Sequence, residues 1–147
     1  MSHTPTLSIA VLAGGYSGES VISLKSADTI MENIDRSIFS PLLVKIERGN
    51  WWVESDGDSY DIDKKDFTWI DQFGKKNAFD SIFIMVHGTP GEDGIIQQYF
   101  ENLKIPFTTG SSESVKGTFN KFLTTKALRN DGYTVADAVE VLNSEIL

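Results

Sequence analysis

Two glycine-rich segments carry the side chains in this sequence that are best suited to chemistry. The first, residues 14–23, reads GGYSGESVIS and contains Glu19. The second, residues 87–94, reads HGTPGEDG and contains His87 and Glu92. A carboxylate can hold an ammonium group by a charge-assisted hydrogen bond, and an imidazole suits a region where negative charge accumulates. These two segments are therefore the candidate site.

The first segment has the features of a turn from a strand into a helix. Glycines at 14 and 15 let the backbone turn sharply and approach a ligand without a Cβ atom in the way. Ser17 is the predicted helix N-cap, which puts Glu19 in the first helical turn, where the helix dipole favours its ionised form. The alternative is structural: a first-turn acid and a loop. The glycine spacing does not fit G-x-G-x-x-G, which argues against a dinucleotide site.

The second segment also ends a predicted strand. Pro90-Gly91 predicts a type II turn, and Asp93 can cap the next helix. His87 is one of two histidines and lies at a strand end, where open α/β sheets bind ligands; a purely structural histidine is the alternative. Neither histidine has partners spaced for zinc and the chain has no cysteine, so no metal ligands are predicted.

The elements around these segments alternate between strand and helix. Two short apolar runs, LSIAVL at 7–12 and SIFIMV at 81–86, predict strands buried on both faces. The alternation predicts an α/β fold, an open and mostly parallel Rossmann-like sheet with helices on both faces. The other expected strands are 41–46, 51–54, 105–108 and 138–142. The expected helices are 21–34, 95–103, 111–119 and 121–130, with a weakly patterned one at 66–73.

Composition limits the function further. The 147 residues are 40% hydrophobic and 23% charged, which suits one globular domain with a real core. The net charge of −8 without a basic stripe argues against a nucleic-acid partner. No apolar run approaches the roughly 20 residues of a membrane helix, and residues 1–8 lack a signal-peptide pattern, so a cytoplasmic location is expected.

Taken together, GG-x-S-x-E and HG-x-x-GEDG resemble segments of the D-alanine-D-alanine ligase family in order and spacing. Residues 105–112 (IPFTTGSS) and 118–121 (TFNK) are similar to two further family segments. The resemblance runs from about residue 7 to residue 142. It implies an amino-terminal, pre-ATP-grasp domain over residues 1–117 and the beginning of a truncated ATP-grasp domain over residues 118–147.

The resemblance implies an ATP-dependent ligase that joins two D-alanines for peptidoglycan synthesis. ATP would phosphorylate the carboxylate of one D-alanine, and the amine of the second would attack the acyl phosphate. Mg²⁺ would neutralise the phosphates, and the full-length enzyme would be a homodimer. Most of the ATP-binding machinery would lie beyond this chain, so the chain alone is expected to be inactive.

The same resemblance implies individual roles. Glu19 would hold the ammonium of the first D-alanine, His87 would line that pocket close to the acyl phosphate, and Glu92 would belong to a hydrogen-bonded network behind them. Lys121 would point toward the nucleotide phosphates. The remaining substrate-binding positions would be Gly15, Ser17, Ser23 and Gly88.

Two other functions fit the sequence. One is a stand-alone α/β module that binds a small amino acid or nucleotide. The other is a different ATP-grasp ligase that shares this fold but joins another carboxylate and amine. The paired segments favour the D-alanine enzyme, and the strand expected at 138–142 favours a fragment over a complete module.

Overall fold

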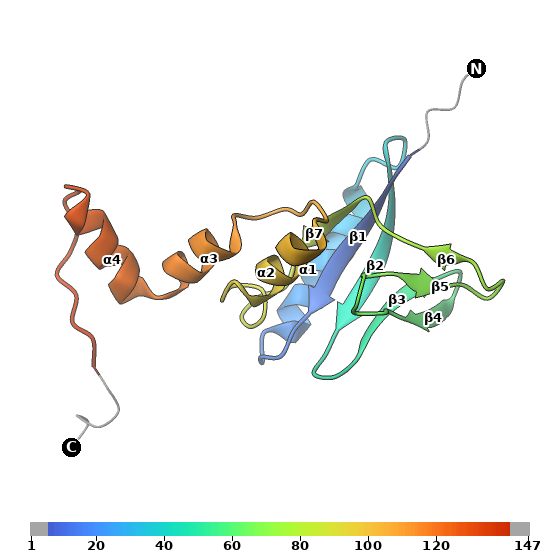
Figure 1. The fold of residues 1–147 in the computed structure, drawn as a ribbon, viewed down its shortest axis with the longest axis horizontal. Coiled ribbons are helices and arrows are strands. Elements are labelled where there is room, and N and C mark those ends of the chain that lie inside the picture. The colour runs from blue at the N-terminus through green and yellow to red at the C-terminus, as the bar shows by residue number, and fades with distance from the viewer. Residues whose placement is uncertain (1–5, 142–147) are drawn as a thin grey trace.

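A central sheet of five strands organises the chain in the computed structural model, which describes residues 6–141 (Figure 1). Its strand order is β4-β3-β2-β1-β7. The strands are β1 (Leu7–Gly14), β2 (Phe39–Ile46), β3 (Trp51–Ser55), β4 (Asp58–Asp61) and β7 (Ser81–Ile84). A separate hairpin consists of β5 (Trp69–Ile70) and β6 (Lys76–Asn77). The helices are α1 (Ser20–Asn33), α2 (Ile95–Leu103), α3 (Ser112–Phe119) and α4 (Lys121–Asn130).

Strand β1 lies at the centre of the parallel part of the sheet. It pairs in parallel with β2 on one side, from Leu7 opposite Phe39 to Gly14 opposite Ile46, and in parallel with β7 on the other. Strands β3 and β4 extend the β2 edge as an antiparallel meander. The chain therefore builds outward from β1 first on one side and then on the other. The carboxyl end of β1 is thus the topological switch point, where such sheets bind ligands.

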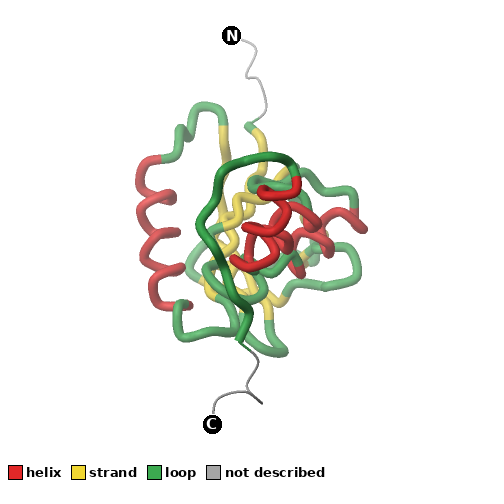
Figure 2. The backbone as a smooth tube through the Cα atoms, turned by 90° about the vertical axis from the view of Figure 1, so that its left-hand side faces the viewer, coloured by secondary structure: helices red, strands yellow, loops and turns green. Residues whose placement is uncertain are grey.

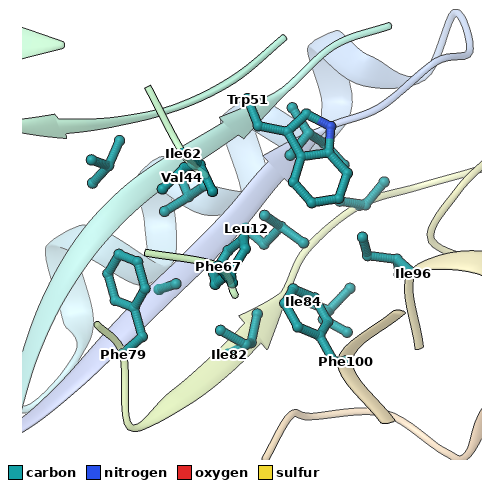
Figure 3. Close-up of a cluster of buried hydrophobic side chains, with 14 of the residues drawn as sticks. Leu12, Val44, Trp51, Ile62, Phe67, Phe79, Ile82, Ile84, Ile96 and Phe100 are labelled. Atoms are coloured by element: carbon teal, nitrogen blue, oxygen red, sulfur yellow. The ribbon is translucent and has the colours of Figure 1, made fainter. Parts of the chain in front are cut away.

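The strands alternate between two apolar layers, as their period of two requires. In β1, Leu12 faces the larger cluster together with Ile82 of β7 and Phe100 of α2, whereas Val11 faces a smaller cluster with Ala27 of α1. Figure 3 shows the larger cluster. Within it, the rings of Phe67 and Phe100 pack edge to face, with their centroids 4.9 Å apart. Burial on both faces explains why the apolar run of β1 is continuous.

Helices cover both faces of the sheet, and the predicted mostly parallel α/β fold is confirmed. Figure 2 shows α1 on one side of the strands and the other helices on the opposite side. Helix α1 buries Ala27 and half-buries Leu24, Ile30 and Met31, whereas Val21 in its first turn is 59% exposed. Helix α2 matches its predicted bounds and buries Ile96 and Phe100.

The segment between β3 and β7 differs most from the prediction. The helix expected at 66–73 is wrong: this segment instead contains a turn and strand β5, which pairs with β6. The acidic stretch before it, residues 55–66, contains β4. Phe67 and Trp69 explain the difference, because both are buried in the larger cluster and fix the chain there by tertiary contacts.

Three predicted strands are shorter or absent. The strand expected at 81–86 ends at Ile84. Of residues 105–108, only Phe107 makes a parallel bridge, opposite Ile82, at the free edge of β7. Residues 138–141 form no strand, and Leu142 lies outside the described residues. A strand needs a partner, and nothing in the described part of the chain pairs with 138–141.

The turn between β5 and β6 is exposed but well bonded. The backbone N–H groups of Lys75 and Phe73 and the side-chain amide of Asn77 donate to the carboxylate of Asp71. These bonds, that of Lys75 first, hold the pKa of Asp71 below its usual range. Phe73 at the tip is 86% exposed.

Helices α3 and α4 project from the body that contains the sheet (Figure 1). Neither has a buried residue, and α3 touches the body mainly through α2. The predicted domain boundary at residue 117 falls within α3, and the division into domains 1–117 and 118–147 stays a prediction. None of the helices in residues 6–141 has the length and apolarity needed to cross a membrane.

Candidate functional site

The turn after β1 leads into α1, but its capping differs from the prediction. The helix begins at Ser20, so Glu19 is the N-cap residue and lies just before the first turn. Ser17 is two positions further out, and its hydroxyl accepts the N–H of Glu19 at 3.2 Å. The predicted Ser17 N-cap is therefore wrong. The turn after β1 runs through Gly18, so the helix begins two residues later than a Ser17 N-cap would require. The side chain of Glu19 is left exposed at the helix start.

The turn after β7 also differs in detail. The N–H of Gly91 donates to the carbonyl of Gly88 at 2.7 Å, and the Thr89–Pro90 peptide is cis. Pro90 is thus the third residue of the turn, whereas a type II turn would place it second. Asp93 Oδ1 accepts the N–H of Ile95 at 3.2 Å, so Asp93 does cap α2, from the position before its N-cap residue, Gly94.

These two turns are in direct contact, as their place at neighbouring strand ends predicts. The N–H of Tyr16 donates to the carbonyl of Thr89 at 2.9 Å, and Ser17 Oγ lies 3.5 Å from the carbonyl of His87. Gly88 lies against the other turn so closely that a Cβ atom there would be 2.6 Å from Glu19 Oε2 and 2.6 Å from Ser17 Oγ. A Cβ atom at this position would displace the ends of these two side chains, and the φ of +66° independently favours glycine.

A hollow of about 460 Å³ opens beside the second turn. It brings together three of the predicted site residues: His87, Glu92 and Lys121. His87 Nδ1 and Glu92 Oε1 are 3.8 Å apart, with the side chains 39% and 49% exposed. That distance is too long for a hydrogen bond, so the two side chains are neighbours in the hollow without a direct bond. Lys121 enters from the first turn of α4, where the helix dipole adds to its positive charge.

The other predicted residues lie around this hollow but do not line it. Gly15 and Ser17 line a second, smaller hollow of about 260 Å³ at the ends of β1 and β2, together with Lys45 and Arg48. Glu19 lines neither hollow and lies at the contact between the two turns, beside Gly88. The structure therefore brings the two turns together, while Glu19 and His87 do not line one common wall in the described chain.

Ser23 has a structural position. It is fully buried, accepts the N–H of Gly14 at 2.9 Å and donates to the carbonyl of Met85 at 2.7 Å. Its hydroxyl therefore joins the ends of β1 and β7 to α1, and it lines neither hollow. Ser23 therefore helps to fix the switch point, and its contact with substrate stays a prediction.

Replacing Ser23 with alanine is expected to lower the free energy of unfolding by about 1–3 kcal/mol, because the buried N–H of Gly14 loses its acceptor. Urea unfolding followed by tryptophan fluorescence measures the loss. Ser26→Ala is the control, since Ser26 is also on α1 but makes no side-chain hydrogen bond within residues 6–141. Equal losses for the two variants would contradict the proposed role of the Ser23 hydroxyl.

Sequence reasoning missed three residues with polar side chains that line the larger hollow, Gln97, Thr109 and Thr118. Gln97 is fully buried on α2, together with Ile96 and Phe100. Thr109 follows the bridge at Phe107 and has a positive φ of 86°. The signal in the sequence was weak: a glutamine directly after Ile96, within the predicted helix 95–103.

This arrangement is suited to binding a small molecule that carries both a positive and a negative group. The larger hollow offers a cation at Lys121 and a histidine for anionic groups, and Glu19 offers a carboxylate for an ammonium group nearby. Within residues 6–141, no group of three or more His, Cys, Asp or Glu side chains is placed to hold a metal ion.

Comparison with known proteins agrees with the family resemblance of the two glycine-rich segments. The family model described as "D-ala D-ala ligase N-terminus" matches residues 8–111. The chain is 40% identical over 132 residues to a D-alanine–D-alanine ligase of Azobacteroides pseudotrichonymphae, covering 89% of this chain and 40% of that protein. It is 41% identical over 134 residues to one of Porphyromonas gingivalis, covering 90% and 40%.

A solved structure agrees with the fold. The D-alanine–D-alanine ligase of Coxiella burnetii superimposes with a TM-score of 0.80 and 29% identity, over 91% of this chain and 44% of that one. The chain thus spans about 40% of the length of the two curated relatives. Because the family model covers most of the chain and includes both turns of the site, the chain belongs to the D-alanine–D-alanine ligase family, as part of its amino-terminal region.

Proposed function

We propose that this chain is the amino-terminal part of an ATP-dependent ligase that joins two D-alanines for peptidoglycan synthesis. The observation that carries the proposal is the contact between the two turns at Gly88. It places the carboxylate of Glu19 next to the turn that brings His87 to the hollow. The chain spans only about 40% of its relatives, so we expect catalysis to need the complete protein.

Binding and orientation are the work that these residues would do. Glu19 would accept hydrogen bonds from the ammonium group of the first D-alanine, which offsets part of the cost of desolvating that group. This would direct the carboxylate of the same molecule toward His87. Lys121 and the amino end of α4 would face the phosphates of ATP, since both are positive. Glu92 would orient the imidazole of His87 from 3.8 Å.

The reaction then needs two balanced steps. A carboxylate oxygen of the first D-alanine takes the γ-phosphoryl group of ATP, giving an acyl phosphate and releasing ADP. The free amine of the second D-alanine attacks the carbonyl carbon, the C–O bond to phosphate breaks, and the nitrogen loses a proton as the peptide bond forms. His87 would lie where negative charge grows on the acyl group, and positioning and electrostatics would supply most of the catalysis.

Other parts of the proposal concern the complete protein. The described residues provide no cluster of metal ligands, so the Mg²⁺ that neutralises the phosphates would take its ligands from outside them. We also propose that the complete protein is cytoplasmic, where ATP is available, and that it forms a homodimer.

The test is the release of ADP and phosphate by the complete protein. We expect release only when D-alanine is present, with L-alanine inactive at the same concentration. Equal activity with L-amino acids would indicate a different ATP-grasp ligase. Binding of D-alanine without ATP turnover would indicate a small-molecule binding module.

Replacement of Gly88 by alanine tests whether the position of the Glu19 carboxylate affects D-alanine binding, apart from its effect on the free energy of unfolding. A positive φ costs an alanine about 1–2 kcal/mol, and the new Cβ would push the carboxylate of Glu19 aside. We expect the D-alanine concentration for half-maximal activity to rise about tenfold, which corresponds to about 1.4 kcal/mol of lost binding.

Gly49→Ala is the matched control, because Gly49 has φ +90° and no atom within 4 Å of an added Cβ. Both variants should lose similar unfolding free energy in urea, but only Gly88→Ala should need more D-alanine. An unchanged D-alanine requirement in Gly88→Ala would show that the position of Glu19 is unimportant.

A further inference from the structure

Gln97 of α2 connects two segments that line the larger hollow. Its side chain is fully buried, and Nε2 donates to the carbonyl of Gly91 at 2.7 Å and approaches Thr109 Oγ1 at 3.4 Å. Gly91 belongs to the turn that starts at His87. Thr109 follows the bridge between Phe107 and β7 by two residues. All three residues line the hollow together with His87.

The amide is costly to keep at this position. Its other atom, Oε1, is buried and has no hydrogen-bond partner in the described part of the chain. A buried acceptor without a partner destabilises a fold, and an apolar side chain of similar shape would remove this acceptor but leave the carbonyl of Gly91 unpaired in its place, so the amide brings no net gain. Stability alone therefore does not explain a glutamine here, and polar residues that cost stability are typical of functional sites.

The connection made by Gln97 reaches both sides of the hollow. The carbonyl of Gly91 accepts a hydrogen bond from no other group within residues 6–141. Glu92 follows Gly91 directly, and the N–H of Glu92 donates to Gly88, so a shift of Gly91 moves the whole turn. On the other side, Thr109 precedes Gly110 and Ser111, which lead into α3 and on to Lys121.

We propose that Gln97 is a positioning residue that ties the turn of His87 and Glu92 to the Thr109 segment, and so sets the distance between the imidazole and the phosphate side of the hollow. The inference rests on the proposed ligase function for its kinetic consequence. Its structural consequence, the position of His87, is independent of that function. Gln97 itself does not need to touch either substrate.

Gln97→Met removes the amide and keeps the volume. It exchanges one unpaired buried acceptor, Gln97 Oε1, for another, the carbonyl of Gly91, so we expect the melting temperature to change little. In the complete protein we expect kcat to fall about tenfold, with the D-alanine KM changed less than about twofold. Misplacement of reacting groups by about 1 Å can cost about 100-fold in rate, and the expected shift of the turn is smaller.

Gln97→Glu provides a pH signature that a merely structural role would not give. An ionised carboxylate cannot donate to Gly91, but a protonated one can, and burial raises the pKa of a carboxyl group. The kcat of Gln97→Glu, divided by that of the unmodified protein, should therefore rise as the pH falls. A ratio that does not change with pH, with Gln97→Met keeping its full kcat, would overturn the proposal.

The 147-residue chain tests the structural part without turnover. In NMR spectra, Gln97→Met should shift the imidazole resonances of His87 and the amide resonance of Glu92. The control Gln98→Met changes the exposed neighbour on α2 and should shift neither. Unmoved His87 resonances in Gln97→Met would overturn the inference even if the ligase assay succeeds. Shifted resonances with no D-alanine-dependent ADP release would support it and reject only the ligase function.

Discussion

Glu19→Ala is expected to raise the D-alanine concentration for half-maximal activity of the complete protein about 10- to 100-fold. A hydrogen bond to a charged group contributes about 1.5–3 kcal/mol, and each 1.4 kcal/mol changes an affinity tenfold. Glu19 is the N-cap residue of α1, the first turn of this helix contains no other acidic residue, and the Glu19 carboxylate lies beside Gly88. Steady-state kinetics with varied D-alanine at saturating ATP measure the effect.

Two variants make that result interpretable. Glu19→Gln keeps the size and two lone pairs but loses the charge, so its effect should be intermediate. Glu32→Ala removes an exposed acid near the other end of α1 and should leave the D-alanine requirement unchanged. If Glu19→Ala lowered kcat but not the D-alanine affinity, the carboxylate would act on the reaction and not on the ammonium group.

His87→Ala is expected to lower kcat about 100-fold with little change in the D-alanine requirement. Removing one donor that stabilises a developing anion typically costs about 100- to 1,000-fold in kcat. The imidazole lines the larger hollow and is 39% exposed, so its loss should hardly change stability. Single-turnover measurement of ADP release gives the rate of the chemical step.

Glu92→Gln is the comparison for His87→Ala. The 3.8 Å gap between His87 Nδ1 and Glu92 Oε1 makes their interaction weaker than a hydrogen bond, so the kcat of Glu92→Gln should fall less than that of His87→Ala. If Glu92→Gln were the more severe variant, Glu92 would have a direct part in the reaction. If His87→Ala kept its kcat, the imidazole would be structural, as the sequence alone allowed.

The sheet and the position of the site could be predicted because they follow from local patterns. The apolar run of β1 is continuous because β1 is buried on both faces, that of β7 because one face is buried and the other half-buried, and each run ends in a glycine turn. Parallel strands next to each other bring such turns together, which the contact of Tyr16 with Thr89 confirms. Helix α2 was predicted to the residue because its apolar positions recur at helical spacing.

The parts that could not be predicted depend on distant contacts. Strands β5 and β6 are two residues each, and Phe67 and Trp69 are fixed by the core and not by any period. The longer turn before α1 moved the helix start past Ser17, because the hydrogen bonds of that turn involve the other site loop. Gln97 was missed for the same reason, since its partners are 6 and 12 residues away.

The exposed tip of the β5–β6 hairpin offers a unique attachment point for a spectroscopic label. The chain contains no cysteine, so Phe73→Cys would introduce a single reactive thiol at a position that is 86% exposed. The carboxylate of Asp71 keeps this tip ordered, and β5 and β6 lie on the side of the sheet body away from α3 and α4 (Figure 1). A dye there, paired with a second one on α4, would measure whether the distance between the hairpin and α4 changes when ATP is added.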